Sequence, residues 1–206
     1  MLSAPADSLR LKSYKLDEVV VTGTRNETYI RHLPMAISVV GRRQLEQTYQ
    51  PAILPALTEQ VPGLFTTSRG IMGYGVSTGA AGGMSRRGIG AGVNAAGGPT
   101  TILLLLVDGH PQYMGLMGHP IADAYQSMMT ERVEVLRGPA SVLYGSNAMG
   151  GVINIVTRKM QEDGEKTNAQ TGNGSYNTLQ TAVYNRVRKG RFSTQVISSY
   201  KRTHGN

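Results

Sequence analysis

The stretch of sequence that decides the fold spans residues 132–158 and reads RVEVLRGPASVLYGSNAMGGVINIVTR. Its two ends, residues 132–136 and 151–157, are dominated by β-branched and aliphatic side chains, a composition typical of strands. The stretch also contains four glycines and a proline. Glycine adopts turns that other residues resist, so we expect a sharply turning, closely packed link between the strands. No cluster of acidic, thiol or histidine side chains occurs here, and we expect no covalent chemistry.

Short elements precede this stretch. The pattern predicts strands at residues 17–23, 37–40 and 101–107, and helices at 42–47, from about Pro55 to Val61, and at 120–128. The unbroken apolar run at 101–107 indicates a strand that is buried on both faces. Residues 70–98 contain 11 glycines and few large apolar side chains, so we expect a long set of loops.

The first predicted strand, residues 17–23, follows a polar N-terminal segment that we expect to be disordered. One interpretation is an ordinary edge strand. The other is a strand that binds a partner protein by β-augmentation, in which main-chain hydrogen bonds supply the affinity.

The last quarter of the chain has a different pattern. Apolar and polar residues alternate over residues 179–186 and 192–200, and the polar turn 188–191 separates them. The pattern predicts a β-hairpin with one apolar or aromatic face and one polar face. Such a pair is typical of a transmembrane β-barrel, and a soluble sheet produces it nearly as often.

Composition narrows the function classes. The 206 residues are enough for one large domain, and the absence of cysteine excludes a disulfide scaffold and a thiolate metal site. Residues 158–206 carry 9 Lys and Arg against 3 Asp and Glu, which accounts for +6 of the net charge of +8. A basic tail of this kind either binds nucleic acid or anionic lipid, or forms solvated strand faces.

Catalytic motifs are missing, and the sequence predicts that the chain is not an enzyme. One cluster of possible ligands lies just past the third predicted strand, and its members are His110, Tyr113, Met114, Met117 and His119. Histidine and thioether groups suit a soft metal such as copper, whereas histidine and tyrosine suit haem iron. The alternative is a surface loop in which methionine fills space.

Several motifs occur in an order that resembles the plug domain of TonB-dependent outer-membrane receptors. They are LDEVVVTGTR (16–25), PMAISVVGRRQLEQ (34–47), LTEQVPGL (57–64), SRRGIG (85–90), LLLLVDGHP (103–111) and ERVEVLRGPASVLYGSNAMGGVINIVTR (131–158). The resemblance covers roughly residues 16–160, and the last motif is the most specific of them. Pro55, and the length of the glycine-rich stretch 70–98, depart from the family pattern.

The resemblance implies an α+β fold: a small mixed β-sheet plug with short helices and long Gly-rich loops, followed by antiparallel strands of a truncated transmembrane β-barrel. Such barrels have about 22 strands, with the plug inside the pore. The implied division is a flexible N-terminal segment (1–24), the plug (25–160) and the first barrel strands (161–206). The implied location is the outer membrane of a Gram-negative bacterium, with a periplasmic N-terminus.

The resemblance also implies partners. The periplasmic domain of TonB would bind a TonB box, which here consists of Asp17, Glu18, Val19, Val20, Val21 and Thr22. TonB would drive uptake of a scarce ligand such as an iron-siderophore, haem, cobalamin, a metal or a glycan. No cofactor and no nucleic-acid partner are implied. Of these ligands, the His–Met loop favours haem or a metal.

Two arginines have implied roles. In this family, plug arginines pair with barrel glutamates, and the matching residues here are Arg87 and Arg137. Desolvated pairs of this kind cost about 3–5 kcal/mol to break. For Arg87 the alternative is an ordinary loop charge beside Arg86.

Two other functions remain open from the sequence. One is a free-standing soluble binding module whose tail strands complete its own sheet. The other is a structural or signalling plug that works without TonB. The first residues, MLSAP, lack the basic and apolar segments of a secretory signal peptide, which fits a soluble protein or a processed piece of a targeted one.

Overall fold

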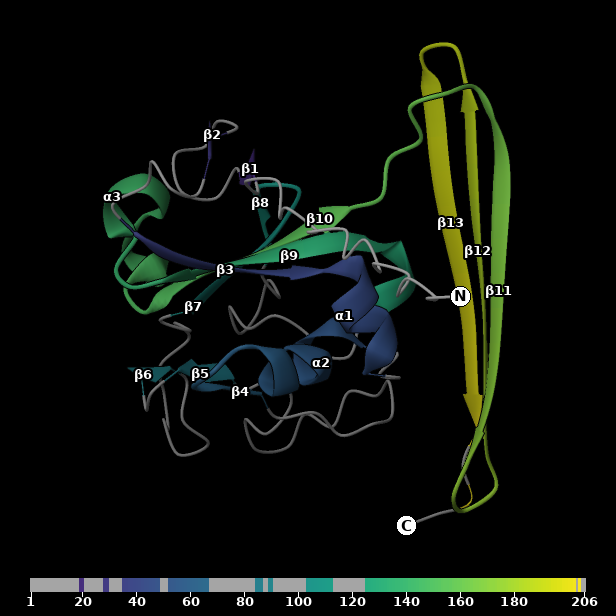
Figure 1. The fold of residues 1–206 in the computed structure, drawn as a ribbon, viewed down its shortest axis with the longest axis horizontal. Helices are drawn as coiled ribbons and strands as arrows, with labels where there is room; N and C mark the ends of the chain where they lie inside the picture. Colours follow the sequence, from purple (N-terminus) through teal and green to yellow (C-terminus); the bar gives the residue numbers. More distant parts are fainter. Residues whose placement is uncertain are drawn as a thin grey trace, which may run out of the picture.

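The structure of the chain is a computed structural model, and it describes residues 19–20, 28–29, 35–48, 52–66, 84–86, 89–90, 103–112, 125–202 and 204. Figure 1 shows a mixed sheet with short helices beside a long sheet of three strands. The stretch 132–158 connects the two, because its strands lie in the mixed sheet and its end leads into the long sheet.

The mixed sheet has five strands in the order β3-β9-β10-β7-β8. They span Ala36–Gly41 (β3), Leu103–Val107 (β7), His110–Pro111 (β8), Thr130–Arg137 (β9) and Gly151–Thr157 (β10). β10 pairs parallel with β7 and antiparallel with β9, and β3 pairs antiparallel with β9. The predicted strands at both ends of 132–158 are therefore confirmed, and they form the middle of the sheet.

Apolar side chains cover both faces of this sheet. Successive residues of β7 point to opposite faces, so that Leu103 and Leu105 belong to one apolar cluster and Leu104 and Leu106 to the other. All four are at most 1% exposed. The unbroken apolar run is thus buried on both sides, as its composition predicted.

Two helices cover the first face. α1 (Arg42–Gln47) and α2 (Ile53–Gln60) confirm the predicted helices, and Pro55 lies in the first turn of α2, where a missing N–H costs little. Among the described residues, no helix is long and apolar enough to cross a membrane.

The helix predicted at 120–128 is wrong over the residues that the structure describes. Gln126 forms an extended bridge with Ala52, and the carbonyl of Tyr125 accepts a hydrogen bond from the N–H of Ile53 at 2.8 Å. This pairing supplies a partner for the first turn of α2 and keeps residues 125–126 extended. A short 3-10 turn, η3 (Ser127–Met129), follows, and residues 120–124 lie outside the described residues.

The link between β9 and β10 contains more regular structure than its composition indicated. It forms α3 (Ser141–Tyr144) and a 3-10 turn, η4 (Ser146–Ala148), which lie over the second face of the sheet. Gly145, with φ of +84°, separates the two turns. Glycine is therefore needed here to change direction between two short helical segments.

Two smaller sheets complete this part of the chain. β1 (Val19–Val20) pairs with β2 (Thr28–Tyr29), and β4 (Leu64–Thr66), β5 (Met84–Arg86) and β6 (Ile89–Gly90) form an antiparallel sheet. The expectation that residues 70–98 contain only loops is wrong for β5 and β6. Backbone pairing of β5 with β4, and of β6 with β5, supplies strand hydrogen bonds without the large side chains that sequence patterns detect. The other residues of 70–98 lie outside the described residues.

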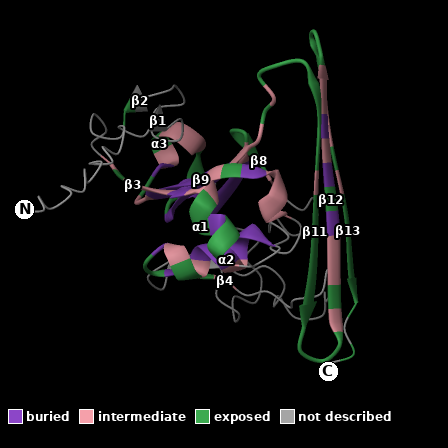
Figure 2. Ribbon diagram, turned by 45° about the vertical axis from the view of Figure 1, so that its right-hand side comes forward, coloured by how far each residue is buried: buried purple, intermediate pink, exposed green. Residues whose placement is uncertain are grey.

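The long sheet consists of β11 (Gly164–Gly174), β12 (Thr178–Lys189) and β13 (Phe192–Arg202), all antiparallel. The predicted hairpin is confirmed, with a tight turn at Gly190 and Arg191 between β12 and β13. β12 carries the buried residues of this sheet, which are Ala182, Tyr184 and Arg186 (Figure 2). Their side chains share one face, because alternate residues of a strand point the same way.

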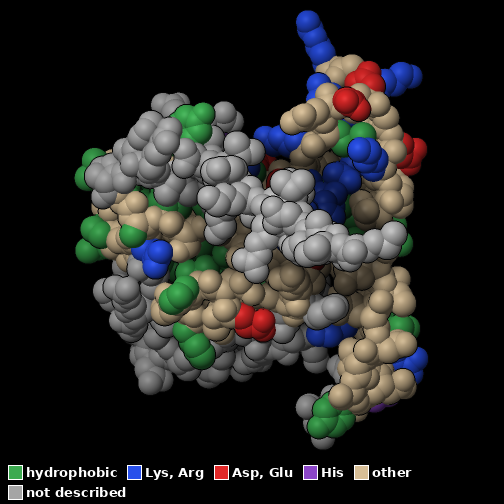
Figure 3. All heavy atoms as spheres, viewed as in Figure 1, with side chains coloured by type: hydrophobic (Ala, Val, Ile, Leu, Met, Phe, Trp, Pro, Cys, Tyr) green, Lys and Arg blue, Asp and Glu red, His purple; other side chains and the backbone are tan. Residues whose placement is uncertain are grey.

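The opposite face of the long sheet is apolar and exposed. Pairing between β12 and β13 places its large side chains together, and they are Leu179, Val183, Phe192, Val196 and Tyr200. Lysine and arginine side chains gather mainly over the upper part of this sheet (Figure 3). The two-faced character predicted from alternation is therefore present in three dimensions.

Candidate functional site

The candidate partner-binding strand forms part of the small sheet β1–β2. Val19 lies opposite Tyr29 and Val20 opposite Thr28 in antiparallel register. The other members of the predicted TonB box, Asp17, Glu18, Val21 and Thr22, lie outside the described residues. The segment is therefore extended at Val19 and Val20, and its role remains a prediction.

The structure describes one member of the predicted ligand loop. His110 lies in β8, is exposed, and pairs with Val107 of β7. Tyr113, Met114, Met117 and His119 lie outside the described residues. Within the described part of the chain, no group of three or more His, Cys, Asp or Glu side chains is placed to hold a metal ion.

The predicted ion-pair residue Arg137 ends β9 between two other strands. Its register neighbours are Ala36 of β3 and Gly151 of β10. The Nε atom is buried and has no hydrogen-bond partner among the described residues. Arg87, the other predicted ion-pair residue, lies outside them. The role of Arg137 in an ion pair remains a prediction.

A second group of charged residues lies at the seam between the two sheets, and sequence reasoning did not identify it. The guanidinium groups of Arg158 and Arg186 both lie over the ring of Tyr184, 5.8 Å and 5.2 Å from its centroid. Arg158 follows β10, whereas Tyr184 and Arg186 belong to β12. Two features of the sequence could have indicated this group: the basic C-terminal part of the chain, and the alternation that places Tyr184 and Arg186 on one face of a strand.

Burial changes the electrostatics of this seam. Desolvation lowers the pKa of Arg158, and the nearby charges of Arg42 and Arg186 lower it further. The Nε atoms of Arg158 and Arg186 are both buried without a hydrogen-bond partner in the described structure. A guanidinium remains charged under such conditions, so the seam carries concentrated positive charge.

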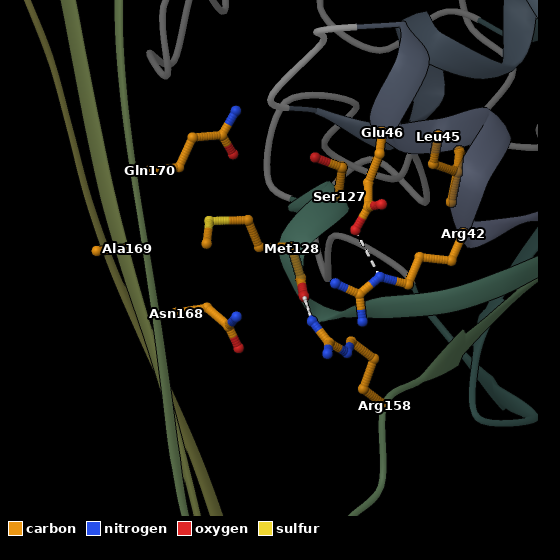
Figure 4. Close-up of a pocket in the computed structure, with 9 residues that line it drawn as sticks. All are labelled: Arg42, Leu45, Glu46, Ser127, Met128, Arg158, Asn168, Ala169 and Gln170. Carbon is orange, nitrogen blue, oxygen red and sulfur yellow. Dashed lines mark hydrogen bonds and ion pairs between the residues drawn. The ribbon is translucent and has the colours of Figure 1, made fainter.

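The seam also contains a cavity. A cavity of about 300 Å³ lies between α1, η3 and β11, and Figure 4 shows the side chains that line it. Arg42 Nε donates to Glu46 Oε1 at 2.5 Å on one side, and Arg158 Nη1 donates to the carbonyl of Met128 at 3.5 Å. Asn168 and Gln170 project from β11 on the other side. Charged, neutral polar and apolar residues all contribute to this lining, and they are Arg42, Glu46, Arg158, Ser127, Asn168, Gln170, Leu45, Met128 and Ala169.

Comparison with known proteins identifies the part of the chain that carries the mixed sheet. Residues 30–152 match the TonB-dependent receptor plug domain. The chain belongs to this family. The family resemblance of the sequence motifs is therefore confirmed, and the mixed sheet with its short helices is the plug.

Curated relatives of this chain include two proteins of Vibrio. The iron-regulated outer membrane virulence protein of Vibrio cholerae is 38% identical over 157 residues, which are 72% of this chain and 21% of that protein. The vitamin B12 transporter BtuB of Vibrio vulnificus is 30% identical over 159 residues, which are 77% of this chain and 23% of that protein. The chain thus spans less than a quarter of the length of these relatives.

Solved structures support the fold of both sheets. The alcaligin outer membrane receptor FauA from Bordetella pertussis matches with a TM-score of 0.66 at 19% identity, over 90% of this chain and 29% of that protein. The ferric yersiniabactin uptake receptor FyuA from Yersinia pestis matches with a TM-score of 0.58 at 24% identity, over 79% and 24%. The predicted fold class, a mixed-sheet plug followed by antiparallel strands, is confirmed.

Proposed function

We propose that this chain is the plug and the first barrel strands of an outer-membrane receptor that takes up a scarce nutrient with energy delivered by TonB. The division proposed is an N-terminal segment with the TonB box (1–24), the plug (25–160) and barrel strands (161–206). The plug lies inside the barrel, and the N-terminus faces the periplasm. This role is one of transport and includes no catalytic step.

The observation that carries the proposal is the two-faced long sheet beside the plug. Its polar face, with Tyr184 and Arg186, lies against the plug, and its apolar face points away from it. A barrel that encloses a plug in a membrane requires this arrangement, because lipid contacts one side of each strand and the lumen the other. A soluble sheet would bury its apolar face in its own core.

The outward face also carries hydrogen-bonded polar groups near the start of β11. Asn185 lies on that face, and its Nδ2 donates to Glu165 Oε1 at 2.6 Å and to Thr167 Oγ1 at 2.9 Å. These groups satisfy one another across β11 and β12. Hydrogen bonding among these groups lowers the cost of placing polar side chains on an otherwise apolar face.

The proposed ligand is a small molecule that other members of the family are named for, such as an iron chelate or cobalamin. The names of the Vibrio relatives refer to iron regulation and to vitamin B12. Haem and a metal ion are also proposed as ligands, because the loop that begins at His110 contains histidine, tyrosine and methionine side chains. Comparison of uptake of a ferric siderophore, haem, cobalamin and copper by the complete receptor separates these ligands.

The role of TonB is tested with variants of Val20 in the complete receptor. Val20→Pro removes the backbone N–H that would donate a hydrogen bond to a partner strand. This variant should abolish uptake and leave ligand binding to cells unchanged. Val20→Thr keeps a β-branched residue and the N–H, and should retain uptake. A peptide of residues 13–25 should bind the periplasmic domain of TonB. Uptake that persists in cells without TonB would contradict the proposal.

The ligand loop is tested separately. His110→Ala combined with His119→Ala in the complete receptor should weaken ligand binding and leave the amount of receptor in the membrane unchanged. Unaltered affinity for every transported ligand would remove these histidines from the binding site. The test does not bear on the TonB box, which lies elsewhere in the chain.

A further inference from the structure

The polar face of the long sheet carries charged side chains of one sign. This face, the lumen face of the proposed barrel, consists of the even-numbered residues of β11 and β12 and the odd-numbered residues of β13, which the strand register places side by side. Its charged members are Lys166, Arg186, Arg188 and Lys201. Glu165 is the one acidic residue of these three strands, and it lies on the opposite face.

Acidic residues offset only part of the positive charge of the two arginines. Arg188 Nε lies 3.8 Å from Asp163 Oδ1, but the side chain of Asp163 is 63% exposed, and solvent weakens such a pair. Arg186 is 7% exposed, and its Nη2 donates to the neutral Oδ1 of Asn168 at 3.2 Å. No carboxylate lies within ion-pair distance of Arg186 in the part of the chain that the structure describes. Positive charge therefore remains on this face.

The balance of charge is different near the start of β11. Residues of both signs line a cavity of about 490 Å³ there, and they are Lys159, Lys166, Arg186, Glu162, Asp163 and Glu165. The negative charges in this region leave little field beyond it. The excess of positive charge on the lumen face therefore lies farther along the strands, between Arg186 and Lys201.

The lumen face is open at the end that carries Lys201. Lys201 is exposed, whereas Tyr184, near the middle of β12, is fully buried. Gln180 lies opposite Lys201, and Gly172 lies opposite Gln180. A Cβ at Gly172 would have nothing within 4 Å, so this row of three residues has free space above it. The row presents an ammonium group and a side-chain amide to that space.

This end of the sheet is the outer end in the proposed receptor. The connection from β12 to β13 at the other end is a two-residue turn, Gly190 and Arg191, and short turns of outer-membrane barrels are periplasmic. Lys201 is near the far end of β13, about 30 Å from that turn at the usual rise per residue. A ligand that enters from outside therefore reaches Lys201 before it reaches Arg186.

We propose that the ligand of this receptor is a small molecule of net negative charge, such as a ferric chelate with carboxylate or catecholate groups, and that Lys201 and Gln180 bind it at the outer end of the lumen face. This inference rests on the proposed function, because it requires a closed barrel. Walls of one sign concentrate a ligand of the opposite sign between them. Of the proposed ligands, haem shares this chemistry through its two propionates, whereas copper ion and cyanocobalamin do not.

The first measurement compares probes of different charge in cells that carry the complete receptor. A ferric tris-catecholate, ferric citrate and haem are the anionic probes, and cyanocobalamin and a ferric tris-hydroxamate are the neutral ones. We expect uptake of an anionic probe, with an association rate that falls as salt is added. The three anionic probes separate an iron chelate from haem.

The second measurement changes the charge of the row. Lys201→Gln should lower the association rate of the transported anionic probe by about threefold, and Lys201→Glu by about tenfold or more. The matched control is Arg202→Gln, which removes the neighbouring positive charge from the outward face and should leave the rate unchanged. Heat-modifiable mobility in gels shows that each variant assembles.

A variant on the neighbouring strand keeps the test decisive if Lys201→Glu does not assemble. Gln180→Glu places a carboxylate in the same row, opposite Lys201, and should lower the association rate of the anionic probe as well. A rate that stays the same in both Lys201→Gln and Gln180→Glu would overturn the inference, because the ligand would not meet this row.

Failure of the inference is distinguishable from failure of the transport role. Uptake of a neutral probe, with none of the anionic probes taken up, would overturn the inference and support the transport role. A transported anionic probe whose association rate is independent of salt would also overturn it. Uptake of none of the probes would contradict the proposed function, and the inference with it.

Discussion

At the scale of single residues, Gly151 occupies a position with no room for a side chain. It begins β10 with φ of +138°, and a Cβ there would lie 2.5 Å from the carbonyl oxygen of Leu136. We expect Gly151→Ala to destabilise the folded protein by about 3 kcal/mol, through backbone strain and a clash with a strand that cannot move freely. Urea denaturation of the purified protein measures this loss.

The matched control for Gly151 is Gly41. Gly41 also lies at the end of a strand, but its φ is −79° and an added Cβ would have nothing within 4 Å. Gly41→Ala should change the free energy of unfolding by less than about 0.5 kcal/mol. If both substitutions lowered the free energy of unfolding equally, the contact with the Leu136 carbonyl oxygen would not be the reason that residue 151 must be glycine.

A second residue, Tyr125, gives the plug a dependence on alkaline pH. Burial raises the pKa of its phenol from 10.0 to about 12. Since the folded-state pKa exceeds the unfolded value, this contribution to stability is complete below the unfolded pKa and is lost as the pH rises through the folded one. Tyr125→Phe should therefore shift the alkaline unfolding midpoint to higher pH, whereas Tyr176→Phe, at an exposed turn, should not. Ultraviolet phenolate absorbance and circular dichroism monitor the two transitions.

At the scale of elements, the turn between β7 and β8 forms hydrogen bonds with the end of β10, the strand that pairs parallel with β7. Asp108 adopts φ of +48°, and its carboxylate accepts hydrogen bonds from Thr157 N at 2.9 Å and Thr157 Oγ1 at 2.6 Å. Asp108→Ala should cost about 1–2 kcal/mol in the free energy of unfolding, through both lost acceptors and the positive φ. Asp108→Asn tolerates that conformation and keeps one acceptor, so its cost should be smaller, and a cost equal to that of alanine would contradict this role.

The elements that the sequence predicted well are those with a local signal. β7, β9, β10 and the β12–β13 hairpin follow from apolar runs, alternation and turn residues, which act over a few positions. β5 and β6 escaped prediction because β4, the partner of β5, lies some twenty residues earlier along the chain, and β6 in turn pairs with β5. The spacing of apolar residues predicts a helix over residues 125–126, whereas their pairing with Ala52 and Ile53 at the start of α2 keeps them extended.

The candidate site illustrates the same limit over longer separations. Arg158 and Tyr184 are 26 positions apart, and they meet only because the chain after β10 returns along β11 and β12. The alternation predicted that Tyr184 and Arg186 share a face, and it contained no information about what that face contacts. Such a cluster becomes visible once the plug and the long sheet are placed together.

At the scale of the whole molecule, the plug lies against one face of the long sheet, and the proposed function places the opposite face in lipid. Val183 of β12 lies on the face that points away from the plug and is 40% exposed, whereas Ser199 of β13 lies opposite Ala182 on the inward face. In a membrane, an arginine on the lipid side costs about 2–4 kcal/mol near the midplane, and an arginine in the polar lumen costs much less. Val183→Arg should therefore reduce the assembled complete receptor in outer membranes, and Ser199→Arg should not. Heat-modifiable mobility in gels reports assembly, and equal tolerance of both substitutions would exclude lipid contact at Val183.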